Sequence, residues 1–372
     1  MTDTDHTAQS APTSLLGYSL SDMESLFAEM GQKPYRVKQT LEWIYQQRVD
    51  EIGQMTNLPA DLRQQLAETY HLNNLEHIET KGASDTTRKF LFRLHDGRYV
   101  ETVFIPASVG LKGKQSSRKT ICVSSQVGCA YGCKFCASGL AGFTRNLTAS
   151  EIIGQMLSVE KNAGEAINNI VFMGMGEPLA NLKNLTKALE IITGHWGLNI
   201  GARSITVSTS GLAPQIRKLA EFPVPIRLAI SLHGATDEVR DLIMPINKKY
   251  PIKELFDALH YWRTHKKQKI SLEYILIEGV NDDLEQAAIL AKRAKGLNAK
   301  VNLIPYNTVE GLEWKRPSQE HCIAFRDVVA AQGINTTLRL EKGGDINAAC
   351  GQLRLKKETA EGIIKAPAKM RR

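Results

Sequence analysis

Short runs of apolar and β-branched residues alternate with longer amphipathic stretches from about residue 120 to the end of the chain. Runs of this kind, bounded by helices, are typical of parallel strands joined by helical crossovers. The runs are ICVSSQV, NIVFMG, SITVSTS, IRLAISLH, ISLEYILIE and KVNLIPYN, and the helices after them are expected to begin near Thr148, Asn181, Ala213, Pro251, Asp283 and Ser318. Six such units predict an α/β fold, an incomplete (β/α)6 barrel rather than a closed barrel of eight units.

The first part of the chain follows another pattern. Apolar residues recur at helical spacing, and we expect three helices there: one capped by Ser21, one from about Arg36 to Gln47, and one after Pro59. Basic residues at Arg36, Lys38 and Arg48 accompany them. Alternating apolar residues on both sides of Asp96-Gly97 then predict a β-hairpin.

These changes divide the chain into five expected parts. They are a disordered leader (1–13), a small helical RNA-binding domain (14–80), a β-hairpin with a linker (81–119), the partial barrel (120–351) and a basic C-terminal tail (352–372).

Composition changes this picture only at the C-terminus. Of 372 residues, 42% are hydrophobic and 23% are charged, as in an ordinary globular protein. The formal charge of +8 permits a polyanionic partner without requiring one. The segment from Gln352 to Arg372 contains seven Lys and Arg and two Glu, which gives it a net charge of 7 − 2 = +5. Composition alone favours a solvated, partly disordered tail, and a phosphate-contacting arm is the alternative.

The sequence predicts a cytoplasmic protein with no membrane association. It has no uncharged apolar run of the ~18 residues that a membrane helix needs. Residues 1–13 lack the basic and then apolar order of a signal peptide. In a reducing compartment, its six cysteines favour metal ligation or catalysis over structural disulfides.

Three cysteines, Cys129, Cys133 and Cys136, stand within eight residues directly after the first barrel strand. Three thiolates on a [4Fe–4S] cluster leave one iron without a protein ligand. That iron can chelate the amino and carboxylate groups of a methionine. The alternative is a structural zinc site, which needs four protein ligands and would use Cys122 as the fourth. The CxxxCxxC spacing, with Phe135 before the last cysteine, resembles the radical S-adenosylmethionine (SAM) superfamily.

A second motif, GMGEP, ends the next strand. Its glycines would let a ligand approach the backbone, and the Glu177 carboxylate can pair with the ammonium group of SAM. Polar residues also end later strands. Each of these could be an ordinary strand-end residue, but together they lie on one predicted rim. The candidate SAM-binding residues are Gly176, Glu177, Ser208, Ser231, Leu232, His233 and Asn307.

Longer segments extend the resemblance over residues 14–355. SSQVGCAYGCKFCASGLAGFTRNLTASEI, GMGEPLAN, ISLHGATDEVRDLIMPINKKYPI, VNLIPYN and DINAACGQL are similar to the bacterial RlmN-type radical-SAM RNA methyltransferases of the RlmN/Cfr family. The N-terminal KPYRVKQTLEWIY resembles their helical RNA-binding domain. The resemblance implies methylation of adenine C2 in 23S rRNA, with tRNA as a second candidate substrate.

The resemblance also assigns roles to residues. Cys350 would be methylated by one SAM, and a 5′-deoxyadenosyl radical from a second SAM would take a hydrogen from that methyl group. After the carbon radical adds to adenine C2, Cys122 would attack the Cys350 sulfur and release the product, leaving a disulfide. Glu101 matches the family's proton acceptor. The resemblance further implies an electron donor such as flavodoxin, and a monomer is expected.

Two alternatives stay open at this point. A Cfr-type enzyme would methylate adenine C8 with the same cysteines. A non-catalytic RNA-binding protein with a structural metal site would use the cysteines differently, and it would not cleave SAM.

Overall fold

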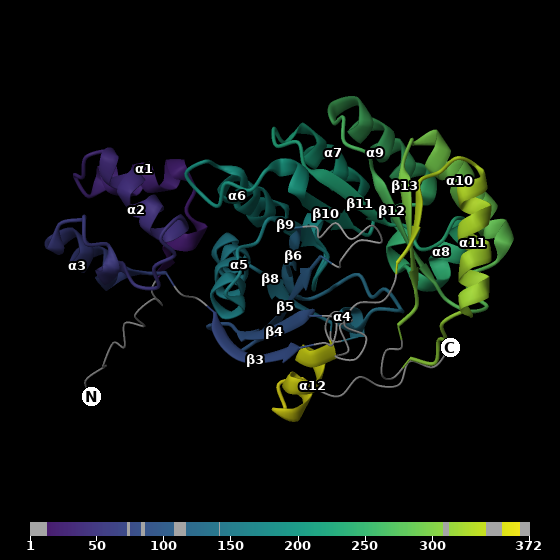
Figure 1. Cartoon of the computed structure of the whole chain (residues 1–372), viewed down its shortest axis with the longest axis horizontal. Coiled ribbons are helices and arrows are strands. Elements are labelled where there is room, and N and C mark those ends of the chain that lie inside the picture. The colour runs from purple at the N-terminus through teal and green to yellow at the C-terminus, as the bar shows by residue number, and fades with distance from the viewer. Residues whose placement is uncertain are drawn as a thin grey trace, which may run out of the picture.

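The computed structural model describes residues 13–72, 75–82, 86–107, 117–140, 142–307, 312–339 and 352–364. Within these residues one sheet holds ten strands, in the order β14-β13-β12-β11-β10-β9-β6-β5-β4-β3 (Figure 1). Its parallel strands are β6 (Lys119–Cys122), β9 (Asn169–Phe172), β10 (Ile205–Thr209), β11 (Arg227–Ser231), β12 (Ser271–Leu276), β13 (Lys300–Pro305) and β14 (Thr336–Leu338).

The parallel strands follow one another in chain order, which is the arrangement of an incomplete barrel. The six predicted strands are confirmed, and the short β14 adds a parallel edge beyond them. The crossover helices are α5 (Ala149–Ala163), α6 (Leu182–Thr193), α7 (Ala213–Glu221), α8 (Asp237–Ile243), α9 (Ile252–His265), α10 (Leu284–Gly296) and α11 (Gln319–Ala331). Thr148, Asp283 and Ser318 cap three of them through their side chains, so these predicted helix starts are confirmed.

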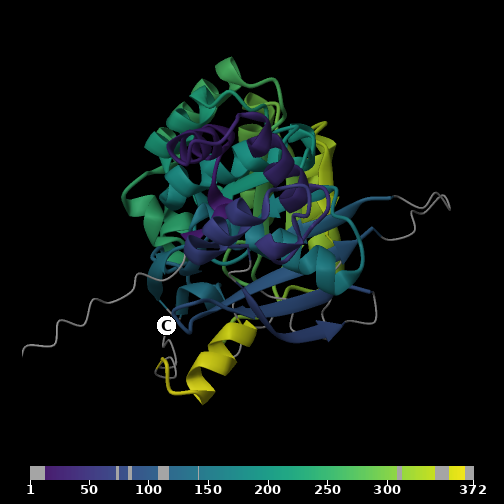
Figure 2. The same cartoon turned by 90° about the vertical axis from the view of Figure 1, so that its left-hand side faces the viewer.

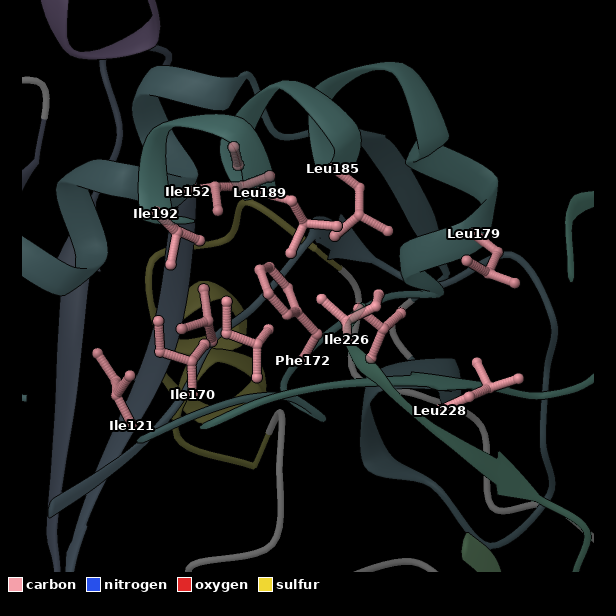
Figure 3. Close-up of a cluster of buried hydrophobic side chains, with 14 of the residues drawn as sticks. Ile121, Ile152, Ile170, Phe172, Leu179, Leu185, Leu189, Ile192, Ile226 and Leu228 are labelled. Carbon is pink, nitrogen blue, oxygen red and sulfur yellow. The ribbon is translucent and has the colours of Figure 1, made fainter. Parts of the chain in front are cut away.

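One face of the sheet carries the hydrophobic core beneath the helices. Ile121, Ile170 and Phe172 from the strands pack toward Leu189 and Ile192 of α6 (Figure 3). Successive side chains of a strand point to opposite faces. The residues between these apolar positions therefore face the interior of the partial barrel.

The predicted hairpin is confirmed as β4 (Arg88–Arg93) and β5 (Tyr99–Pro106), and β5 joins β6 in antiparallel pairing. A third strand, β3 (Glu76–Gly82), pairs with β4. The expectation that residues 76–80 belong to a helical segment is wrong. This stretch is polar and mostly exposed, so its sequence has little intrinsic preference for helix or strand. It becomes a strand because it pairs with the open edge of β4.

The N-terminal helices α1 (Leu20–Glu29), α2 (Tyr35–Tyr45) and α3 (Ala60–Thr69) lie at one end of the molecule, beside α6 (Figure 1). Short strands β1 (Thr13–Ser14) and β2 (Tyr70–His71) pair with each other. Ser19, not Ser21, caps α1, in a capping box with Asp22. Ion pairs join this unit to the barrel helices: Arg48 to Glu160 at 2.9 Å and Lys187 to Asp22 at 2.7 Å. The predicted leader lies outside the described residues up to residue 12.

The C-terminal segment corrects the sequence interpretation. Gln352–Ala360 form helix α12, which lies against the antiparallel strands on the side away from the crossover helices (Figure 2). Leu353, Arg354 and Glu358 are 8%, 1% and 0% exposed. A solvated tail is therefore wrong for residues 352–364, because buried Arg354 and Glu358 pair with each other at 2.8 Å and Glu358 accepts from Tyr99 N at 3.2 Å. Residues 365–372 lie outside the described residues. No helix in the described part of the chain is both long and apolar enough to span a membrane.

Candidate active site

The register of the sheet places four of the predicted site residues on its inner face. Residues paired across neighbouring strands point to the same side, as do residues two apart on one strand. Cys122 pairs with Val103, which is two residues from Glu101 on β5. The same face continues through the pairs Cys122–Val171, Val171–Thr206, Ser208–Ala229 and Ser231–Glu273. Glu101, Cys122, Ser208 and Ser231 therefore line one surface, opposite the hydrophobic core.

The cysteine motif forms a loop between a small hairpin and a helix. The hairpin consists of β7 (Gln126–Gly128) and β8 (Phe143–Asn146), and α4 (Ala137–Leu140) follows the last cysteine. Cys129 N donates to Gly142 O at 3.0 Å, and Lys134 N donates to Ile243 O at 2.9 Å. A Cβ on Gly128, whose φ is +79°, would overlap the Gly142 carbonyl oxygen, so only glycine fits at this corner.

Two of the three thiols lie in an environment that favours a bound cation. Burial raises the pKa of Cys129 to about 12, and nearby Cys136 and Glu177 add to the effect. Burial, Cys136 and Cys129 raise the pKa of Cys133 well above its usual range. Thiolates become stable in such a place when a metal supplies positive charge.

Three thiols in one loop are the donor set that a [4Fe–4S] cluster with one open iron requires, whereas a structural zinc ion requires four protein ligands. Among the described residues no group of three or more His, Cys, Asp or Glu side chains is placed to hold a single metal ion. A [4Fe–4S] cluster binds each of its three thiolates on a different iron. Its ligands therefore stand further apart than those of one ion.

The GMGEP turn packs directly on the strand that leads into the cysteine loop. A Cβ on Gly174 would lie 2.7 Å from Ser124 Oγ, and a Cβ on Gly176, with φ at +97°, would lie 2.5 Å from Gln126 Cβ. Ser125 N donates to Met175 O at 2.9 Å, and Glu177 N donates to Gln126 Oε1 at 2.8 Å. The described structure therefore explains these glycines by close packing of two protein segments, whereas the sequence suggested close approach of a ligand.

Glu177 is held in one orientation at the end of β9. Its carboxylate accepts hydrogen bonds from Ser210 N at 2.7 Å and Leu179 N at 3.0 Å, and the residue is 3% exposed. Burial raises the pKa of Glu177, and these hydrogen bonds oppose that rise. Because its charge affects Cys129 and Cys133, the carboxylate lies close to the cysteine loop. The two motifs that the sequence singled out therefore meet in space.

His233 also contacts the cysteine loop. Its ring meets the edge of Phe135 with centroids 4.8 Å apart, and its Nδ1 accepts from Ile275 N at 3.0 Å. Burial, with a contribution from Arg240, lowers the pKa of His233 to about 3. The imidazole is therefore neutral, with its proton on Nε2. Leu232 is buried beside it, and half-buried Asn307 follows β13.

Arg240 links the strand ends, and no sequence motif pointed to it. Its side chain is fully buried, and it donates to Leu232 O at 3.0 Å, to Asn247 Oδ1 at 2.7 Å and to Ser210 O. It thereby ties the end of β11 to the end of β10. In the sequence DEVRDLI this arginine looks like a residue of a solvated helix face.

Glu101 is more constrained than an exposed acid on a hairpin strand would be. Its Oε2 lies 2.9 Å from Lys89 Nζ, and its Oε1 accepts from Arg354 N at 2.6 Å. Ser124 Oγ donates to the Glu101 carbonyl oxygen at 2.6 Å. Cys350 lies outside the described residues, so the structure does not place it.

Comparisons with known proteins agree with this geometry. Residues 123–291 match the family model of the Radical SAM superfamily, and residues 13–72 match that of the ribosomal RNA large subunit methyltransferase N-terminal domain. A crystal structure of a radical SAM methyltransferase from Sphaerobacter thermophilus superposes with a TM-score of 0.86 at 41% identity, covering 92% of this chain and 99% of that one.

Two curated relatives cover nearly the whole chain. A probable dual-specificity RNA methyltransferase RlmN of Akkermansia muciniphila is 58% identical, over 90% of this chain and 93% of the relative. The dual-specificity RNA methyltransferase RlmN of Campylobacter jejuni is 45% identical, over 89% and 96%.

The partial barrel, the cysteine loop and the GMGEP turn define a radical-SAM methyltransferase, whose cofactors are a [4Fe–4S] cluster and SAM. Identity at this level over nearly the full length narrows the class further. The chain belongs to the RlmN family of dual-specificity RNA methyltransferases.

Proposed function

We propose that this enzyme methylates C2 of adenine in 23S rRNA and in tRNA, through a methyl group first carried by Cys350. The observation that supports this most directly is the shared inner face of Glu101 and Cys122, continuous with the strand ends that would bind SAM. The RNA substrate class rests on the names of the relatives, and rRNA on the name of the N-terminal family.

We assign the cluster to Cys129, Cys133 and Cys136, and the SAM pocket to Gly176, Glu177, Ser208, Ser231, Leu232, His233 and Asn307. When bound, the cluster and SAM supply the 5′-deoxyadenosyl radical. Fixed Glu177 presents a carboxylate for the SAM ammonium group beside the cysteine loop. Neutral His233 adds a donor at Nε2 without adding positive charge near a cationic cosubstrate.

Cys350 and Cys122 then act in two successive steps of the methyl transfer. Adenine C2 is electrophilic, so ordinary transfer of a methyl cation from SAM does not occur there. Cys350 instead carries the methyl carbon to C2 as a thioether. Cys122 attacks the Cys350 sulfur: an S–S bond forms, the C–S bond breaks, and its electron pair stays with the carbon, which takes a proton to become the methyl group. Before that attack, Glu101 accepts the proton that leaves C2, and the cluster, when bound, would take up the one electron that the adduct must also lose. A reductant such as flavodoxin reopens the disulfide.

Cys122 is buried on β6 and faces the barrel interior, as this role requires. The test is Cys122→Ala expressed in cells and run on a denaturing gel. A covalent protein–RNA adduct should accumulate, and it should disappear when Cys350 is also replaced. Normal turnover without an adduct would show that Cys122 is only a packed strand residue.

Two further measurements separate the alternatives. Mass spectrometry of rRNA and tRNA from a knockout and its parent locates the methyl group, and a methyl group on C8 would contradict the C2 assignment. Replacing Cys129, Cys133 or Cys136 by Ala should abolish the reconstituted cluster and SAM cleavage. A variant that keeps both would overturn the ligand assignment.

A further inference from the structure

A buried ion pair lies on the inner face of the sheet beside Cys122. Lys89 on β4 pairs in register with Val103 on β5, which pairs in turn with Cys122 on β6. Lys89 Nζ lies 2.9 Å from Glu101 Oε2, and the two side chains are 0% and 3% exposed. A buried lysine is costly unless it is paired, so its presence here calls for an explanation beyond packing.

The other oxygen of this carboxylate caps helix α12. Glu101 Oε1 accepts from the backbone N–H of Arg354, the third residue of the helix, at 2.6 Å. The first N–H groups of a helix have no acceptor within the helix, and this end attracts negative charge. Glu101 therefore acts as a helix cap that is supplied from a strand about 250 residues earlier in the sequence.

Acidic residues of the C-terminal segment also accept hydrogen bonds from β5. Glu358 on α12 accepts from the backbone N–H of Tyr99 at 3.2 Å, and the Tyr99 hydroxyl donates to Glu361 at 2.8 Å. Leu353 packs in a small apolar cluster with Leu91 and Tyr99. Contacts at both ends of the helix fix its position along β5 as well as its orientation.

Helix α12 lies between this ion pair and the cysteine loop. It packs against α4, which directly follows Cys136. Arg354 Nη1 lies 3.1 Å from the position that a Cβ on Gly128 would occupy, next to Cys129. In the sequence α12 begins two residues after Cys350. The position of this helix therefore determines where the chain that carries Cys350 is anchored.

We propose that Lys89 is a positioning residue for methyl transfer: it holds the Glu101 carboxylate against the first turn of α12 and thereby fixes the helix to which the segment carrying Cys350 is joined in the sequence. The proposal rests on the methyl-carrier role of Cys350 proposed above. It gives Glu101 a second task in addition to proton acceptance, and it assigns a task to Lys89.

The test compares Lys89→Met with Lys89→Gln and with the control Lys253→Met. Lys89→Gln keeps a hydrogen-bond donor toward Glu101. Lys253 lies on α9, where it is 88% exposed and pairs with Asp257 at 2.9 Å, the same distance as in the Lys89–Glu101 pair. Hydrogen exchange of the reconstituted holoenzyme reports on helix docking, and peptide mass spectrometry reports the methylated fraction of Cys350.

In Lys89→Met, exchange in residues 352–364 should accelerate on the order of tenfold, as for loss of a helix cap, while β9 to β12 keep the exchange of the parent. Methylation of Cys350 should fall with it, Lys89→Gln should restore part of both, and Lys253→Met should match the parent. Unchanged exchange in α12, or equal acceleration across the whole sheet, would overturn the proposal. If Lys89→Met does not fold, Lys89→Gln decides by the same criteria, with a smaller local acceleration expected. The exchange result needs no RNA turnover, so failure of the proposed function and failure of this proposal are distinguishable.

Discussion

Replacing Gly176 by alanine tests whether the packing of the GMGEP turn sets both stability and SAM binding. Two separate costs apply. The φ of +97° is rarely adopted by a residue with a Cβ, which costs about 1–3 kcal/mol. The new Cβ would lie 2.5 Å from Gln126 Cβ and 2.8 Å from Gln126 N, and overpacking of this kind costs about 1–3 kcal/mol. We expect the free energy of unfolding to fall by roughly 2–6 kcal/mol in total.

The same clash should move Glu177, because Glu177 N donates to the Gln126 side chain that would have to shift. SAM affinity should therefore fall together with stability. Urea denaturation measures the first effect, and calorimetric titration of SAM into the anaerobically reconstituted enzyme measures the second.

Gly201→Ala is the matched control. Gly201 has a φ of −57°, and nothing lies within 4 Å of the position of its Cβ. Alanine is compatible with this site and should be neutral or slightly stabilising. If the stabilities of the two variants agreed within about 0.5 kcal/mol, the range of ordinary surface substitutions, the packing account of GMGEP would be wrong.

Three further predictions concern stability. Gln155→Leu should lower the free energy of unfolding by about 2–5 kcal/mol in urea denaturation. Fully buried Gln155 forms hydrogen bonds with both Ser124 N and Ser124 O, and these two groups would lose their partners. A loss no larger than that of the exposed-site variant Gln64→Leu would contradict this explanation. Arg240→Lys should cost about 2–4 kcal/mol by the same assay, since a lysine cannot reach Leu232 O, Asn247 and Ser210 O together, and full stability would show that the strand ends do not need this link. Burial alone would raise the pKa of Asp96, but its hydrogen bond from Arg145 at 2.6 Å lowers it overall. The Asp96 contribution is therefore present above the unfolded pKa of about 3.9 and is lost as the pH falls through the folded pKa. Chemical denaturation between pH 5 and pH 2, values chosen to bracket that pKa of about 3.9, should show a smaller acid loss in Asp96→Asn than in the parent, and parallel curves would refute the assignment.

Local patterns predicted the barrel because its elements are locally specified. Helix starts are marked by N-cap residues, whose side chains accept a hydrogen bond from a backbone N–H no more than three residues further along the chain. These residues are Thr148, Asp283 and Ser318. The parallel strands are apolar enough to be recognised without knowing their neighbours. The predicted strand ends also placed Ser208 and Ser231 on one rim, because parallel strands end at the same edge of a sheet.

Features that depend on a distant partner were missed or misread. Lys89 and Glu101 look like charges on a hairpin until the register brings them together. The charged sequence of α12 reads as a solvated tail, because its burial depends on Tyr99 and Glu101, far away in the chain. Gly176 was recognised as special, but its reason is the position of Gln126, which no local pattern contains.

The capping of α12 by a strand near the other end of the chain also bears on the order of events during synthesis. The barrel strands and the cysteine loop are translated before residue 352, and chains fold largely from the N-terminus as they emerge. Glu101 therefore gains its helix only after residues 352–364 have been synthesised. The final closure joins segments about 250 residues apart, and the entropic cost of such a loop grows only slowly with its length. The face of β5 that α12 covers therefore stays uncovered until residues 352–364 have been synthesised.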